Sequence, residues 1–62
     1  MKLKLYLDIR GKSMTEFAQE TGLTLSYISR IIAGNRRPSP RVAAQIEKAT
    51  KGKVSRLELL YP

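Results

Sequence analysis

Residues 14–33 read MTEFAQETGLTLSYISRIIA, and this stretch decides the fold because it predicts two short helices joined at Gly22. Ser13 precedes the stretch and Glu16 follows three residues later, the spacing of a capping box in which each side chain satisfies a backbone N–H group of the other residue. A helix therefore begins near Met14 and ends at Gly22, where glycine tolerates the left-handed backbone of a helix C-terminus. The predicted inward face of this helix, at helical spacing, comprises Met14, Phe17, Ala18 and Thr21.

A second helix follows the turn, with Thr24 as its capping residue and Ala33 near its end. Leu23 is expected to pack in the core below the turn. The predicted buried side of this second helix comprises Ile28, Ile31 and Ile32, whereas Ser26, Ser29 and Arg30 face outward. The stretch is therefore read as a helical pair with a polar face on its second helix.

Residues 1–10 carry two conflicting signals. Apolar and polar side chains alternate from Leu3 to Ile9, a pattern that favours a strand. The spacing of Leu3, Tyr6 and Leu7, followed by Gly11, favours a helix instead. No partner for a lone strand is evident downstream, so we predict a short helix and keep a strand as the alternative.

The segment after residue 33 supports the helical pair. Residues 34–40, GNRRPSP, have the glycine, asparagine and prolines of a loop. Ser39 and Pro40 then begin a further helix that is expected to end at Gly52. Its predicted inner stripe comprises Val42, Ala43, Ile46 and Ala49.

A last short helix is predicted over residues 56–60. Ser55 and Glu58 repeat the capping-box spacing, and Val54 can contact Leu59 across it. The sequence therefore predicts an all-α fold, a compact bundle of about five short helices, in a single domain spanning residues 1–62.

Composition excludes several classes of function. The chain of 62 residues has no Cys and no His, so thiolate or imidazole metal sites, disulfides and histidine acid–base catalysis cannot form. Its five carboxylates are scattered rather than paired as catalytic acids would be. We therefore expect no enzymatic activity, no cofactor and no metal.

The charge is strongly positive. Twelve Lys and Arg residues against five acids give a formal net charge of +7, which favours a polyanionic partner over charge that serves solubility alone. The segment 26–41 holds four arginines and no carboxylate. No apolar run is long enough to cross a bilayer and no signal peptide is recognisable, so a cytoplasmic protein without a membrane partner is expected.

Residues 14–33 resemble the helix-turn-helix of phage repressor and Cro proteins. Ala18 stands at the small-residue position of the first helix, Gly22 at the turn, and the packing positions are filled by Leu23, Ile28 and Ile31. The run SYISRIIAGNRRPSP and the RVAAQIEKAT helix after it also look like lambda-repressor-like (XRE-like) regulators. The resemblance thus extends over most of the chain, and it implies that the second helix enters the major groove of DNA.

The resemblance also implies roles for individual residues. The side chains expected to face bases are Leu25, Ser26, Ser29 and Arg30, with Arg30 able to donate two hydrogen bonds to guanine and Leu25 able to contact a thymine methyl group. Those expected to contact phosphates are Thr15, Tyr27, Asn35, Arg36, Arg37 and Arg41. Alternatives stay open at three positions, because Leu25 can belong to the core, Arg30 can bind phosphate or remain solvated, and Tyr27 can brace the helix.

The predicted function is that of a sequence-specific regulator that binds double-stranded DNA, of the phage or prophage Cro-like repressor kind, in the cytoplasm of a bacterial or phage-infected cell. The resemblance implies a homodimer on a palindromic operator, and the apolar group Leu59, Leu60 and Tyr61 is the candidate dimer surface unless it merely closes the core. Two alternatives remain. One is an antitoxin-type regulator that binds a toxin partner, and the other is a basic protein-interaction module with no preference among DNA sequences.

Overall fold

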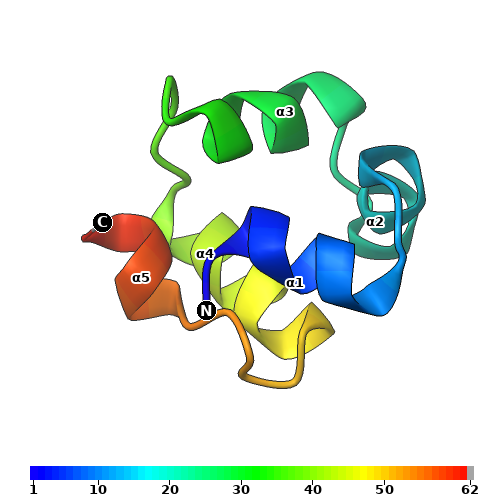
Figure 1. Cartoon of the computed structure of the whole chain (residues 1–62). Helices are drawn as coiled ribbons and strands as arrows, with labels where there is room; N and C mark the ends of the chain where they lie inside the picture. The colour runs from blue at the N-terminus through cyan, green and yellow to red at the C-terminus, as the bar shows by residue number, and fades with distance from the viewer. Residues whose placement is uncertain (62) are drawn as a thin grey trace.

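A computed structural model describes residues 1–61, and within them the chain is helical, with no strand. Figure 1 shows the arrangement, in which α3 lies at one side of the molecule and α2 joins it to the group formed by α1, α4 and α5. The helices are α1 (Leu3–Arg10), α2 (Met14–Thr21), α3 (Leu25–Ala33), α4 (Pro40–Ala49) and α5 (Arg56–Leu60). The predicted all-α bundle is confirmed.

Helix α1 resolves the conflict over residues 1–10 in favour of the helix. Leu3, Tyr6 and Leu7 are buried, as their helical spacing requires, and Gly11 ends the helix in the left-handed conformation with φ 64°. Leu5 and Ile9 are 51% and 63% exposed. The alternation was therefore misleading, because half of its apolar residues face solvent.

Helix α2 begins with the predicted capping box. The Ser13 hydroxyl accepts a hydrogen bond from the Glu16 N–H at 3.0 Å, and the Glu16 carboxylate accepts one from the Ser13 N–H at 2.9 Å. Gly22 ends the helix with φ 74°. Phe17 and Ala18 are buried as expected, but the prediction that Met14 faces inward is wrong. Met14 is 39% exposed because it is the first residue of α2, beyond the edge of the core.

The corner between α4 and α5 differs from the prediction in two details. Helix α4 ends at Ala49 rather than near Gly52, and the buried Thr50 closes the turn through its hydroxyl, which accepts from the Val54 N–H at 3.1 Å. Of the capping box predicted at Ser55 and Glu58, only one of the two hydrogen bonds forms. Ser55 accepts from the Glu58 N–H at 3.2 Å, but the Glu58 carboxylate contacts the Met1 amino group instead of returning to Ser55.

One hydrophobic core holds these helices together. Phe17, Ile28, Ile46 and Val54 are fully buried in it, so α2, α3, α4 and the segment before α5 each contribute a central side chain. Helix α2 packs on both α3 and α4, and α4 packs on α5. The core therefore fixes α3 through one fully buried residue, Ile28, and leaves its other side to solvent. Within residues 1–61 no helix has the length and apolar character needed to cross a membrane.

Candidate nucleic-acid interface

Helix α3 is the element that positions the candidate base-reading side chains. Thr24 begins it, since its hydroxyl accepts a hydrogen bond from the Tyr27 N–H at 3.1 Å. Ile28 is fully buried, and Ile31 and Ile32 pack against the same core while remaining partly accessible. These contacts fix the rotation of α3 about its own axis, and hence which of its side chains face solvent.

The four candidate base-reading residues lie together on the outward face of α3. All four are exposed. Ser26, Ser29 and Arg30 lie on the side of α3 that faces away from Ile28 and Ile31, and Leu25, the first residue of the helix, lies at the edge of this face. Leu25 is 46% exposed, which excludes the alternative that it is a core residue. The face thus combines two hydroxyls, one guanidinium and one aliphatic side chain. These groups suit base edges and thymine methyl groups in a major groove.

Tyr27 and Arg36 form a contact that links α3 to the loop after it. The Arg36 guanidinium lies over the Tyr27 ring, 4.9 Å from the ring centroid, within the range of a cation–π interaction. Tyr27 is partly buried. The ring of Tyr27 therefore contacts the arginine of the following loop.

The loop between α3 and α4 carries three candidate phosphate contacts. Gly34 adopts φ 80°, and the N–H groups of Asn35 and Arg36 both donate to the Arg30 carbonyl, at 3.0 and 3.3 Å. Pro38 is buried, so the loop is anchored at both ends, while Asn35, Arg36 and Arg37 are exposed. Two cations are thereby held next to the C-terminal end of the helix.

Thr15 lies apart from this group, in the first turn of α2, where it is exposed. Backbone N–H groups at a helix N-terminus attract anions, but the Glu16 carboxylate already occupies this end through the capping box. The hydrogen bond from the Ser13 N–H is the main cause that lowers the pKa of Glu16 below its ordinary 4.5, followed by the Ser13 hydroxyl contact and nearby Lys12. A phosphate at Thr15 would therefore meet a carboxylate charge beside it.

The ion pairs of the described chain lie away from the arginines around α3. Within residues 1–61 the ion pairs are Lys12 with Glu20, Arg56 with Glu47, and the Met1 amino group with Glu58. None involves Arg30, Arg36, Arg37 or Arg41, and Arg41 is exposed in the first turn of α4. The cations around α3 are thus not neutralised by carboxylates of the described chain.

Three features of the structure are absent from the sequence predictions. The Tyr27–Arg36 contact joins residues nine apart, and no local pattern signals it. Pro38 looks like a loop residue but is buried. Glu47 accepts a hydrogen bond from the Arg56 N–H at 3.0 Å and so caps α5 from another helix, which only the tertiary fold can bring about. Among residues 1–61 no group of three His, Cys, Asp or Glu side chains is placed to hold a metal ion.

Comparison with known proteins identifies the domain family to which the chain belongs. No curated protein and no solved structure matches the chain. A family of helix-turn-helix domains matches residues 3–57, which include α1 to α4 and the start of α5. Because this match covers most of the chain, the protein belongs to the lambda-repressor-like helix-turn-helix family of DNA-binding transcription regulators.

Proposed function

We propose that this protein is a Cro-like repressor of a phage or prophage, which occupies an operator by inserting α3 into the major groove. One observation carries the proposal: the outward face of α3 groups Ser26, Ser29 and Arg30 beside exposed arginines that have no carboxylate partner within residues 1–61. Bases would be read from this face, while Arg36, Arg37 and Arg41 hold the phosphates on either side.

The proposed repressor binds as a homodimer. One small module contacts too few base pairs for specificity, and two copies on half-sites about 34–36 Å apart would provide a two-fold arrangement. The exposed apolar side chains at the C-terminal end support a contact there. Tyr61 is 74% exposed and Leu60 is partly accessible.

Selection of bound duplexes from a random pool tests the proposal. The selected duplex and a scrambled duplex of the same composition are then compared at the same salt concentration, because phosphate contacts alone would bind both. A repressor prefers the selected duplex by roughly a thousandfold or more. A ratio near one would contradict the repressor and favour the basic protein-interaction module.

Two arginine variants separate base reading from phosphate anchoring. Arg30→Ala is expected to cost about 1–3 kcal/mol of binding at one base position and to relax specificity there. Arg36→Ala is expected to weaken binding to all duplexes alike and to reduce the salt slope by about one. Titrations of each variant against single-base-substituted operators at several salt concentrations measure both effects. If the two variants behaved identically, the assignment of base reading to Arg30 and phosphate contact to Arg36 would be wrong.

A second candidate is an antitoxin-type regulator with the same DNA-binding face. The exposed Tyr61, at the end of α5, is the observation that favours it, because a toxin partner could cover this side chain. A partner chain that co-purifies in fixed stoichiometry would support the antitoxin, whereas isolation of the free homodimer supports the stand-alone repressor.

A further inference from the structure

A groove separate from the outward face of α3 runs between α3, the loop after it and α5. Its volume is about 510 Å³. Its apolar lining residues come from four parts of the fold: Leu3 of α1, Ile31 and Ile32 of α3, Val54 before α5, and Leu59 of α5. Tyr61 lines it as well. The groove is thus an apolar channel on the side of α3 that faces the rest of the molecule.

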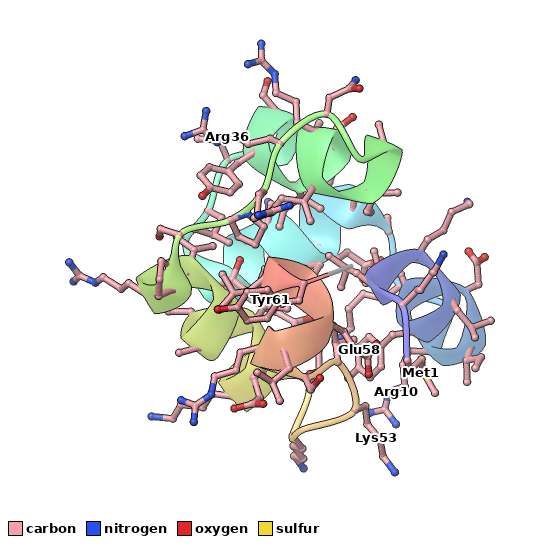
Figure 2. The ribbon with its side chains drawn as sticks, turned by 90° about the vertical axis from the view of Figure 1, so that its left-hand side faces the viewer. Met1, Arg10, Arg36, Lys53, Glu58 and Tyr61 are labelled. Atoms are coloured by element: carbon pink, nitrogen blue, oxygen red, sulfur yellow. The ribbon has the colours of Figure 1, made fainter. Side chains whose placement is uncertain are left out.

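The rim of the groove is cationic. Lys2, Arg36 and Arg37 line it, and no carboxylate of residues 1–61 lies within 4.0 Å of their charged groups. Glu58 also lines the groove, but its carboxylate contacts the Met1 amino group. Figure 2 shows Met1 and Glu58 in the same part of the view as Arg10 and Lys53, whereas Arg36 lies at the opposite side of the molecule, on the loop beside α3. The groove therefore combines apolar lining residues with three cations that have no carboxylate partner within residues 1–61, one of which, Arg36, holds its guanidinium over the Tyr27 ring.

We infer that this groove is a docking site for an acidic amphipathic helix of another protein. Apolar side chains on one face of such a helix would fill the channel between Ile32 and Leu59, and carboxylates beside that face would pair with Lys2, Arg36 and Arg37. A second copy of this chain is disfavoured as the occupant, because a two-fold contact through the groove would place the same cationic rims against each other. Of the two side chains that support the proposed dimer contact, Tyr61 lines the groove, whereas Leu60 does not.

Occupation of the groove is coupled to DNA binding through Arg36 and Arg37. Both line the groove, and both are proposed phosphate contacts. An acidic helix that pairs with them would withdraw them from phosphates, so helix and operator weaken each other's binding by the same factor. This coupling rests on the proposed repressor function, whereas docking of the helix does not.

The docking test uses a synthetic peptide and the full chain without DNA. The probe has roughly 14 residues, about four helical turns, with Leu on one face and Glu on the flanking positions. Two matched peptides replace either every Glu by Lys or every Leu by Gln. We expect the acidic amphipathic peptide alone to shift the amide NMR signals of Ile31, Ile32 and Leu59, and both control peptides to bind at least about tenfold more weakly.

Variants of exposed residues locate the contact without disturbing the core. Arg37→Glu on the rim is expected to weaken peptide binding roughly fivefold or more, while Lys53→Glu, the matched charge reversal outside the groove, leaves it within about twofold. Tyr61→Ala is expected to weaken binding, and Leu57→Ala, which removes another exposed apolar side chain near the end of the chain, is not. Circular dichroism checks that each variant remains folded.

Three results would overturn the docking site: equal binding of the acidic and basic peptides, peptide-induced shifts confined to residues outside the groove, or no shift at millimolar peptide. Concentration-dependent shifts of the groove amides in the absence of peptide would assign the groove to a second copy instead. The coupling is measured separately, as release of the selected duplex by the peptide. If the peptide binds the groove and the protein has no selected duplex, the proposed repressor fails while the docking site stands.

Discussion

At the scale of single residues, the structure decides between alternatives that spacing leaves open. Leu25 lies three positions before Ile28, so helical periodicity allows it a place in the core, but it is the first residue of α3 and is 46% exposed. The contact of Tyr27 with Arg36 could not be predicted either, because Arg36 lies in a loop whose conformation does not follow from the local sequence. Sequence identified the candidate residues, and tertiary packing determined their surroundings.

The Tyr27–Arg36 contact predicts coupling between the two residues in DNA binding. Tyr27→Phe keeps the ring and is expected to leave operator affinity unchanged, whereas Tyr27→Leu removes the ring and is expected to cost about 0.5–1 kcal/mol. In the background of Arg36→Ala the Tyr27→Leu change should cost nothing more. Titration of the four proteins of this double-mutant cycle measures the coupling. A loss of affinity in Tyr27→Phe would show that the hydroxyl, rather than the ring, contacts DNA.

Glu16 gives a pH dependence of stability with a definite sign. Its pKa in the folded chain is lowered below 4.5, first of all by the hydrogen bond from the Ser13 N–H, so the ionised form favours folding. This contribution is fully present above pH 4.5 and is lost as the pH falls through the lowered pKa of the folded state. Glu16→Gln can still accept the Ser13 N–H but does not titrate. Thermal unfolding from neutral to acid pH should therefore show a smaller acid loss for the variant, and parallel curves would contradict this role for Glu16.

At the scale of elements, helix starts were more predictable than helix ends. Ser13, Thr24, Ser39 and Ser55 each accept a hydrogen bond from the N–H three positions ahead, as their sequence context predicts, because this contact depends on one turn of chain only. The ends depend on more distant residues. Helix α4 ends early since the Thr50 hydroxyl bonds to Val54, and Glu58 leaves its capping box for the amino group of Met1.

Gly22, at the turn of the helix-turn-helix, provides a test of the element. It has φ 74°, and a Cβ atom there would meet nothing within 4 Å, so substitution costs only the backbone strain of the left-handed conformation. We expect Gly22→Ala to lower the free energy of unfolding by about 1–2 kcal/mol, and Gly22→Asn to lower it less. Urea unfolding measures both. Equal stability of Gly22→Ala and the parent chain would show that the turn relaxes to another conformation.

At the scale of the whole molecule, composition indicated a polyanionic partner but not the separate surfaces that the folded protein presents. The net charge of +7 and the arginines of residues 26–41 are visible in the sequence and favour a polyanion. The groove between α3 and α5 is not visible there, because Leu3, Ile32 and Leu59 come together only in the folded chain. Arg36, a proposed phosphate contact, also lines this groove, and this dual position can be recognised only in three dimensions.

The small core leaves little stability to lose. Ile46 is fully buried at its centre, and truncation to Ala in a core costs about 2–5 kcal/mol, while a domain of this size rarely holds more than about 3–5 kcal/mol. Ile46→Ala is therefore expected to be largely unfolded at room temperature, and Ile46→Val, at about 0.5–1.5 kcal/mol, to remain folded with a lower melting temperature. Circular dichroism with heating distinguishes the two. A folded Ile46→Ala protein would mean that the surrounding helices collapse into the vacated space.

The burial of Leu3 and Val54 in the same core also affects how the protein folds during its synthesis on the ribosome. These residues belong to one core, although about fifty residues of chain separate them, so α1 has no complete surface to pack on until Val54 has been made. At the usual speed of translation this delay is roughly 3–10 s, long on the scale of helix formation. During that interval Leu3, Tyr6 and Leu7 are exposed on the nascent chain, where chaperones can bind them. New copies would therefore gain the ability to bind DNA only after residue 54 is in place, which sets a lower limit on how fast the regulator can respond.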